Sequence, residues 1–204
     1  MTRMKFCGLK SAADIEAVNR LQPDYIGFVF AEKSKRCVTP ETAAALKALL
    51  RPEIKAVGVF VNEDAAVIAD LLNRDVIDLA QLHGSEGELE IEKLRALTKK
   101  PIIKAFQVKT AEDVRAAEVC TADHILLDSG AGTGTTFDWE ILQNVKRPYF
   151  LAGGLDPANV ANAVRRCHPY AVDVSSGIET DGVKDSEKMA AFQAAVQNED
   201  NISR

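Results

Sequence analysis

Short apolar stretches alternate with longer amphipathic stretches along the whole chain. The short stretches hold four to six residues, many of them β-branched or aromatic, as in strands buried on both faces. Between them, apolar residues recur three and four positions apart, as on the inner side of a helix. The clearest case is the set Val160, Ala163, Val164 and Cys167. We expect eight strands, over residues 4–7, 25–30, 56–61, 77–82, 102–106, 124–128, 149–152 and 171–174.

Capping residues indicate where the intervening helices begin. Ser11 precedes an acid three residues later, and Thr39 and Asp156 each precede a proline that suits the first turn of a helix. The same reasoning predicts helix starts near Asn62, Ser85, Thr110 and Asp185, a short helix over residues 138–143, and a polar, frayed tail over residues 198–204. Apolar residues at helical spacing, such as Ile91, Leu94 and Leu97, are expected to face inward.

Eight strand–helix units in 204 residues leave about 25 residues per unit. A doubly wound open sheet also alternates strands and helices. Eight nearly equal units with almost no insertions favour a closed barrel near the lower size limit of that fold. We therefore expect an α/β protein with a single-domain (β/α)8 TIM barrel spanning residues 1–204.

The charge and the hydropathy of the chain argue against two classes of binding partner, nucleic acids and membranes. The formal charge is −5 and the pI is near 5.3, which argues against a nucleic-acid partner because such proteins concentrate Lys and Arg. No apolar run is long enough to cross a membrane, and the first residues lack the core of a signal peptide. We expect a cytoplasmic protein that binds a small molecule, either as a monomer or as a homodimer.

The cysteines predict neither a disulfide framework nor a zinc site. The chain has four of them, widely spaced and without a CxxC pair. We expect reduced thiols and no metal. Cys120, Cys167 and His168 lie away from the carboxyl ends of the strands, so we assign them to packing or to the surface.

Barrel geometry predicts where the chemistry lies, because reacting residues of this fold stand at the carboxyl ends of the strands. Cys7, His83, Asp128 and Asp173 lie at or just beyond such ends. Each also has a simpler interpretation. A single cysteine at a strand end usually packs as a small hydrophobe, and Asp128 with Ser129 could merely begin a turn.

Three glycine-bearing loops extend the predicted site. The loops after the seventh and eighth strands often bind phosphate in barrels, through free N–H groups and the close approach that glycine allows. We assign phosphate contacts to Gly154, Ser175 and Ser176. The loop after Asp128, with Gly130, Gly132 and Gly134, has the spacing G-x-G-x-G and lacks both the third glycine of a dinucleotide site and a Walker lysine. We expect this loop to close over substrate, although a stiff turn is the alternative.

Several motifs together resemble the phosphoribosylanthranilate isomerase family of tryptophan biosynthesis, within the ribulose-phosphate-binding barrels. They cover nearly the whole chain in the right order. The motifs are KFCGLK (5–10), GFVF (27–30), SKRCVTP (34–40), VGVFVN (57–62), QLHG (81–84), LLDSGAGTGTTFDW (126–139), LAGGLDPANV (151–160) and DVSSGIE (173–179). One departure is the loop SGAGTG, where many relatives have adjacent glycines before the threonine.

The resemblance implies an Amadori rearrangement without a cofactor. The substrate would be N-(5-phosphoribosyl)anthranilate and the product 1-(2-carboxyphenylamino)-1-deoxyribulose 5-phosphate. Carried over to this chain, Asp128 is the general acid and Cys7 the general base. Arg36 would bind the anthranilate carboxylate, although a solvated loop arginine is the alternative. His83 and Asp173 would contact hydroxyl or amine groups of the substrate, or serve as hydrogen-bonded structural residues.

The two reacting groups need opposite adjustments. An acid at neutral pH requires the pKa of Asp128 to rise. A thiolate base requires a lowered pKa for Cys7, unless a small thiolate fraction is sufficient. Three other functional classes compete with this assignment. A related sugar-phosphate isomerase or epimerase would be expected to have two acids where this chain has Cys7 and Asp128. A regulatory phosphate-binding barrel or a purely structural module would need no reactive pair.

Overall fold

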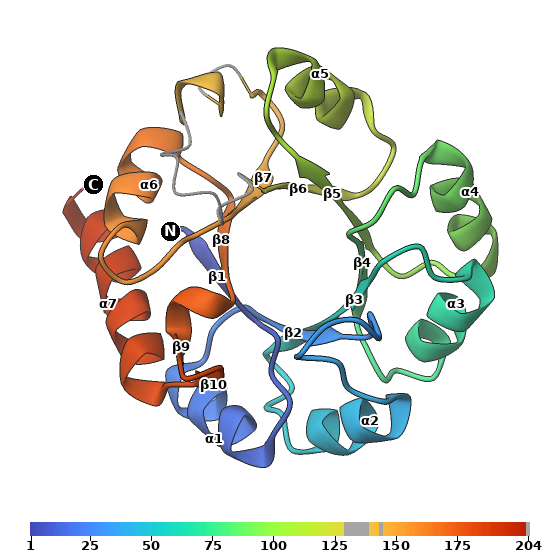
Figure 1. Cartoon of the computed structure of the whole chain (residues 1–204), viewed down its shortest axis with the longest axis horizontal. Helices are drawn as coiled ribbons and strands as arrows, with labels where there is room; N and C mark the ends of the chain where they lie inside the picture. The colour runs from blue at the N-terminus through green and yellow to red at the C-terminus, as the bar shows by residue number, and fades with distance from the viewer. Residues whose placement is uncertain (129–138, 143–144, 203–204) are drawn as a thin grey trace.

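The computed structural model describes residues 1–128, 139–142 and 145–202. Its strands close into one parallel barrel in sequence order, and the α-helices surround the barrel (Figure 1). The fold class predicted from the sequence is confirmed. The eight barrel strands are β1 (Arg3–Cys7), β2 (Tyr25–Val29), β3 (Lys55–Phe60), β4 (Leu79–Leu82), β5 (Ile102–Gln107), β6 (His124–Asp128), β7 (Tyr149–Ala152) and β8 (Ala171–Val174).

The helices follow the strands as in other barrels of this type. They are α1 (Ala12–Leu21), α2 (Pro40–Ala48), α3 (Ala65–Asn73), α4 (Glu88–Leu97), α5 (Ala111–Val119), α6 (Val160–Cys167) and α7 (Ser186–Ile202). Two 3₁₀ helices, η1 (Trp139–Leu142) and η2 (Ser176–Ile178), and a small hairpin of β9 (Glu179–Thr180) and β10 (Val183–Lys184) complete the described elements. The ends of the short helix predicted over residues 138–143 lie outside the described residues, and its described part is η1.

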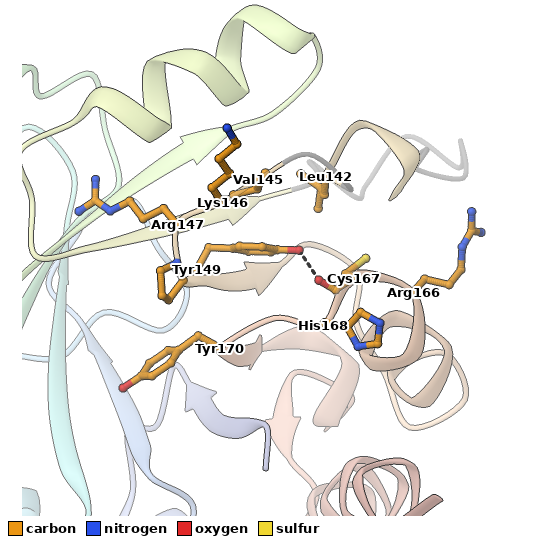
Figure 2. Close-up of a pocket in the computed structure, with 10 residues that line it drawn as sticks. Leu142, Val145, Lys146, Arg147, Tyr149, Arg166, Cys167, His168 and Tyr170 are labelled. Carbon is orange, nitrogen blue, oxygen red and sulfur yellow. Dashed lines mark hydrogen bonds between the residues drawn. The ribbon is translucent and has the colours of Figure 1, made fainter. Parts of the chain in front are cut away.

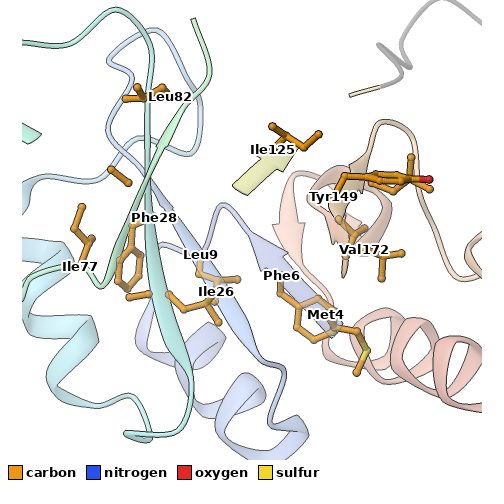
Figure 3. Packing of buried hydrophobic residues seen from close by; sticks show 14 of the residues in the cluster. Met4, Phe6, Leu9, Ile26, Phe28, Ile77, Leu82, Ile125, Tyr149 and Val172 are labelled. Atoms are coloured by element: carbon orange, nitrogen blue, oxygen red, sulfur yellow. The ribbon is translucent and has the colours of Figure 1, made fainter. Parts of the chain in front are cut away.

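Alternation along the strands separates two apolar layers. Met4 and Phe6 of β1 point outward to the helices, where the Phe6 ring meets Phe192 of α7 edge-on at 6.0 Å (Figure 3). Inward-facing residues of the strands form a second cluster, which fills the interior of the barrel and includes Tyr25, Leu126 and Phe150. The odd-numbered residues of β1, Lys5 and Cys7, belong to the inner face. Each strand is therefore buried on both sides, which explains its nearly continuous apolar sequence.

Four predicted helix caps are confirmed and three are wrong. Asp185 accepts hydrogen bonds from the amides of Glu187 and Lys188, in the first turn of α7, at 2.9 and 3.2 Å. Ser11, Thr39 and Thr110 accept hydrogen bonds from their own first turns. Asn62 and Ser85 instead bond to each other, because the Asn62 side-chain oxygen accepts from both the Ser85 amide (2.8 Å) and its hydroxyl (2.9 Å). Their helices begin later, and the N-cap residues are Asp64, Gly87 and, in place of Asp156, Asn159.

Two further predictions are corrected. Residues 198–202 do not fray but continue α7, since buried Glu199 is held by two hydrogen bonds from Arg165 at 3.0 and 2.5 Å. The backbone amide of Thr2 also donates to Asp200 at 2.6 Å. Leu97, expected to face inward, is 49% exposed because it lies in the last turn of α4.

None of the described helices is long and apolar enough to cross a membrane.

Candidate active site

A cavity of about 360 Å³ opens at the carboxyl ends of the barrel strands. Strand direction places the last residue of each strand at this end, so side chains far apart in sequence meet here. The cavity wall contains every site residue predicted from the sequence. They are Cys7, Arg36, His83, Asp128, Gly154, Asp173, Ser175 and Ser176.

Cys7 ends β1 beside a glycine that makes room for its side chain. A Cβ atom on Gly27 of the neighbouring strand would lie 2.6 Å from Cys7 Sγ, so a larger residue there would displace the thiol. The loop after β8 also holds the backbone of Cys7 in place, because the Ser175 hydroxyl donates to the Cys7 carbonyl at 3.1 Å. The thiol is buried and faces the cavity.

The charge environment of Cys7 differs from the prediction. Burial raises the pKa of the thiol, and the ammonium groups of Lys5 and Lys184 oppose this effect without cancelling it. We predicted a lowered pKa unless a small thiolate fraction is sufficient, and the raised pKa favours that alternative. The prediction missed how completely the thiol leaves water at the end of β1, since local sequence does not reveal the packing of the strands around it.

Lys5 and Asp173 form an ion pair inside the barrel. The parallel pairing of β1 with β8 places the two residues directly opposite each other, and Lys5 Nζ lies 2.8 Å from Asp173 Oδ2. The Lys5 side chain is fully buried and the Asp173 side chain is 8% exposed. The second carboxylate oxygen, Oδ1, is buried and has no hydrogen-bond partner among the described residues. This oxygen belongs to a residue that lines the cavity, so it can accept from a bound ligand.

Asp128, at the end of β6, meets a histidine from β4. His83 Nε2 lies 3.4 Å from Asp128 Oδ2, and His83 Nδ1 lies 2.8 Å from Gln81 Nε2. With the Gln81 amide donating to Nδ1, the proton of the neutral ring is on Nε2, facing the carboxylate. The structure thus brings the predicted His83 and Asp128 together. Gln81, which orients the ring from within the barrel, was not predicted as a site residue.

Arg36 lines the cavity but already has one carboxylate partner. Its Nε and Nη2 atoms donate to Glu179 at 2.6 and 2.7 Å, and Lys184 donates to the same carboxylate at 2.6 Å. The Arg36 hydrogen bond lowers the pKa of Glu179 to about 2, with Lys184 adding to it against the effect of burial. The bidentate pair uses one edge of the guanidinium, whose five N–H donors leave others for a second anion. Glu179 and Lys184 were missed, although Glu179 ends the motif DVSSGIE.

The loops after β7 and β8 contact each other at one side of the cavity. Gly154 has a positive φ of 60°, and a Cβ atom on Gly177 would lie only 1.9 Å from the carbonyl oxygen of Leu155. Only glycine permits this approach of the two backbones. The contact brings Gly154 next to the loop that carries Ser175 and Ser176, so the three predicted phosphate residues lie together. The predicted glycine lid, with Gly130, Gly132 and Gly134, lies outside the described residues.

A second cavity, of about 560 Å³, lies at the opposite end of the barrel (Figure 2). Its wall includes Lys146, Arg166 and His168 at the surface. The Tyr149 hydroxyl donates to the Cys167 carbonyl at 2.8 Å, which ties β7 to the end of α6. None of the predicted site residues lines this cavity, and residues at this end of a barrel serve stability. Cys167 is buried and His168 is exposed, in agreement with the packing and surface roles predicted for them.

The described residues offer no group of three or more His, Cys, Asp or Glu side chains that could hold a metal ion. The four cysteines, all within the described ranges, are free thiols. The chemical groups of the first cavity are a thiol, two carboxylates, an imidazole, an arginine and two glycine-containing loops. These groups suit proton transfer on an anionic substrate.

Comparison with known proteins identifies the family. The family model for N-(5'phosphoribosyl)anthranilate (PRA) isomerase matches residues 4–195. The N-(5'-phosphoribosyl)anthranilate isomerase of Endomicrobium trichonymphae is 44% identical over 194 residues, which cover 93% of this chain and 95% of the relative.

Solved structures agree with this. A phosphoribosyl anthranilate isomerase in complex with reduced 1-(o-carboxyphenylamino)-1-deoxyribulose 5-phosphate is 34% identical with a TM-score of 0.84, covering 97% of this chain and 100% of its own. Monomers generated from the dimeric isomerase of Thermotoga maritima are 35% identical, with a TM-score of 0.86 and the same coverage. The chain belongs to the N-(5'-phosphoribosyl)anthranilate isomerase family, whose members are isomerases of tryptophan biosynthesis.

Proposed function

We propose that this chain isomerises N-(5'-phosphoribosyl)anthranilate with Asp128 as general acid and Cys7 as general base. The observation that carries the proposal is the single cavity lined by both residues and by the two loops that suit a phosphate. Acid–base chemistry needs the two groups on the same bound substrate, and the loops supply a fixed point of attachment.

The reaction is a sequence of proton transfers. Asp128 gives a proton to the furanose ring oxygen, the bond from C1 to that oxygen breaks, and the nitrogen lone pair forms a Schiff base with C1. The Cys7 thiolate then takes the proton from C2, and the electron pair of that bond forms a C1–C2 double bond while the nitrogen becomes neutral. Tautomerisation of the resulting enol gives the ketose. No oxidant or reductant is consumed.

We propose binding roles for the other residues of the cavity from their charges and hydrogen bonds. Arg36 is proposed to bind the anthranilate carboxylate through the guanidinium edge that Glu179 does not use. The unpartnered Oδ1 of Asp173 would accept from the substrate amine or a hydroxyl, and His83 would contact a hydroxyl beside Asp128. Gly154, Ser175 and Ser176 would hold the phosphate, largely through backbone N–H groups.

The direct test is turnover of freshly prepared phosphoribosylanthranilate, followed as loss of its fluorescence without added metal or nucleotide. We expect rapid loss, and no acceleration over buffer would reject the activity for this chain. Cys7→Ala and Asp128→Ala should each reduce kcat by about 10²- to 10⁴-fold. Cys37→Ala and Asp70→Ala are matched controls, because both residues are exposed and neither lines the cavity. Near wild-type turnover of folded Cys7→Ala or Asp128→Ala would refute the acid–base assignment.

A related sugar-phosphate isomerase or epimerase is the second candidate, since it would share the barrel and the phosphate loops. The cysteine at the end of β1 favours the phosphoribosylanthranilate reaction, because paired acids would be expected otherwise.

We also propose a cytoplasmic monomer or homodimer. The dimeric relative from Thermotoga maritima supports the second state. Light scattering on the purified chain would distinguish the two.

A further inference from the structure

A lysine lies directly behind the proposed base, inside the barrel. Lys5 and Cys7 are two residues apart on β1, so both side chains belong to the inner face. The Lys5 side chain has no exposed surface. Lysine is almost never fully buried unless it is paired. The position therefore calls for an explanation beyond packing.

The ammonium group of Lys5 has two neighbours. Its Nζ lies 2.8 Å from Asp173 Oδ2, and the Cys7 thiol follows two residues later on the same face of β1. Burial lowers the pKa of Lys5, but the two neighbours outweigh burial and leave this pKa raised, so the ammonium stays charged. A positive charge thus lies on the same inner face of β1 as the thiol, in a region that excludes water.

We propose that Lys5 is a positioning residue for Cys7, whose charge stabilises the thiolate that takes the proton from the substrate. The proposal rests on Cys7 being the base. The proton moves from substrate C2 to Cys7 Sγ, while Lys5 remains protonated and paired with Asp173 throughout. Lys5 therefore neither gains nor loses a proton in the step.

The other charged groups that face Cys7 are less suited to this role. Asp173 on β8 is negative and opposes thiolate formation. Lys184 on β10 donates to Glu179 at 2.6 Å and to the Ser175 carbonyl at 2.9 Å. Arg36 is held by the same Glu179 carboxylate. Lys5 is the largest contribution opposing the effect of burial on the pKa of Cys7.

The test measures the thiol itself. We would follow alkylation of Cys7 by iodoacetamide across pH, identified by peptide mass spectrometry, in wild type and in Lys5→Met. The midpoint of alkylation should move at least one pH unit upward in Lys5→Met. At neutral pH kcat should fall at least tenfold and partly recover at high pH, with a smaller change in KM. Lys104→Met is the matched control, since it removes another buried lysine without moving this midpoint.

The opposite outcomes are distinct. An unmoved midpoint in folded Lys5→Met would overturn the role of Lys5, whatever the activity. Near wild-type turnover of Cys7→Ala would overturn the proposed base instead. If Lys5→Met does not fold because Asp173 loses its partner, Lys5→Met/Asp173→Asn is compared with Asp173→Asn. The same upward shift of at least one unit is then expected, and its absence would again overturn the proposal.

Discussion

Two buried lysine–carboxylate pairs lie on barrel strands, and their surroundings differ. Lys104 of β5 lies in the layer between strands and helices, since it alternates with the inward Ile103 and Ala105. It donates to Glu86 at 3.0 Å and to the Gly84 carbonyl at 2.8 Å. Both oxygens of Glu86 have partners. In the inner pair, Lys5–Asp173, one carboxylate oxygen has none among the described residues.

From this difference we interpret the outer pair, Lys104–Glu86, as structural and propose a functional role for the inner pair. Backbone amides of Asn62 and Gly84 donate to Glu86 at 2.6 and 2.8 Å, so this carboxylate organises the loop that follows β4. Burial opposes the charge of Glu86, yet hydrogen bonds from the Asn62 amide and from its own amide, together with Lys104, hold its pKa below the usual value. An unsatisfied buried oxygen, such as that of Asp173, costs stability of about 1–3 kcal/mol. Its presence at the cavity fits a group that awaits substrate.

The largest change in the free energy of unfolding is expected at the outer pair, Lys104–Glu86. Lys104→Met leaves the buried Glu86 carboxylate without its counter-charge, so the free energy of unfolding should fall by about 3–5 kcal/mol. Turnover of the folded fraction should change little, because Lys104 does not line the cavity. Urea unfolding followed by circular dichroism gives the first quantity and the fluorescence assay the second. A fall in the free energy of unfolding of less than 1 kcal/mol would contradict the structural role of the outer pair.

The inner pair should respond in the opposite way. Replacing both members, as Lys5→Met/Asp173→Leu, removes the ion pair together with the unpartnered oxygen. Apolar replacement of a buried ion pair is often neutral or stabilising by about 1–4 kcal/mol. We expect an unfolding free energy at or above that of wild type and loss of turnover. A loss of stability as large as that of the matched double replacement, Lys104→Met/Glu86→Leu, would show that the inner pair is structural too.

A third charged cluster, at the rim, gives a smaller and pH-dependent effect. The folded pKa of Glu179 is about 2, against an ordinary 4.5. Its contribution to stability is therefore full above pH 4.5 and is lost as the pH falls towards 2. Because Arg36 is 30% exposed, we expect only about 1–2 kcal/mol. Glu179→Gln should be less stable than wild type at pH 6, and the gap should narrow steadily as the pH falls from 4.5 to 2. A gap that is independent of pH would contradict this.

Much of the architecture and the site could be predicted from sequence, for a physical reason. Strands buried on both faces produce apolar runs, and the direction of these strands places Cys7, Asp128 and Asp173 at one end. Lys5 was not singled out in the sequence analysis. Its spacing of two residues from Cys7 is compatible with the inner face, but only the register of β1 with β8 shows that it meets Asp173.

What sequence missed depends on contacts between distant segments. Arg36 and Glu179 are separated by 143 positions, and Arg165 and Glu199 by 34. No local pattern records such pairs. The caps at Asn62 and Ser85 failed for the same reason, since each side chain bonds to the other loop. Local capping signals describe one helix at a time, whereas these residues connect two.

The most direct measurement is a crystal structure of this chain with a reduced product analogue. We predict that C2 of the sugar lies between Cys7 Sγ and Asp128, with the phosphate at Gly154 and Ser175. A donor of the ligand should then reach Asp173 Oδ1, the oxygen that has no partner among the described residues. An analogue whose C2 contacts neither Cys7 nor Asp128, or a complex in which Asp173 Oδ1 stays unpartnered, would contradict the assignment of the inner pair to function.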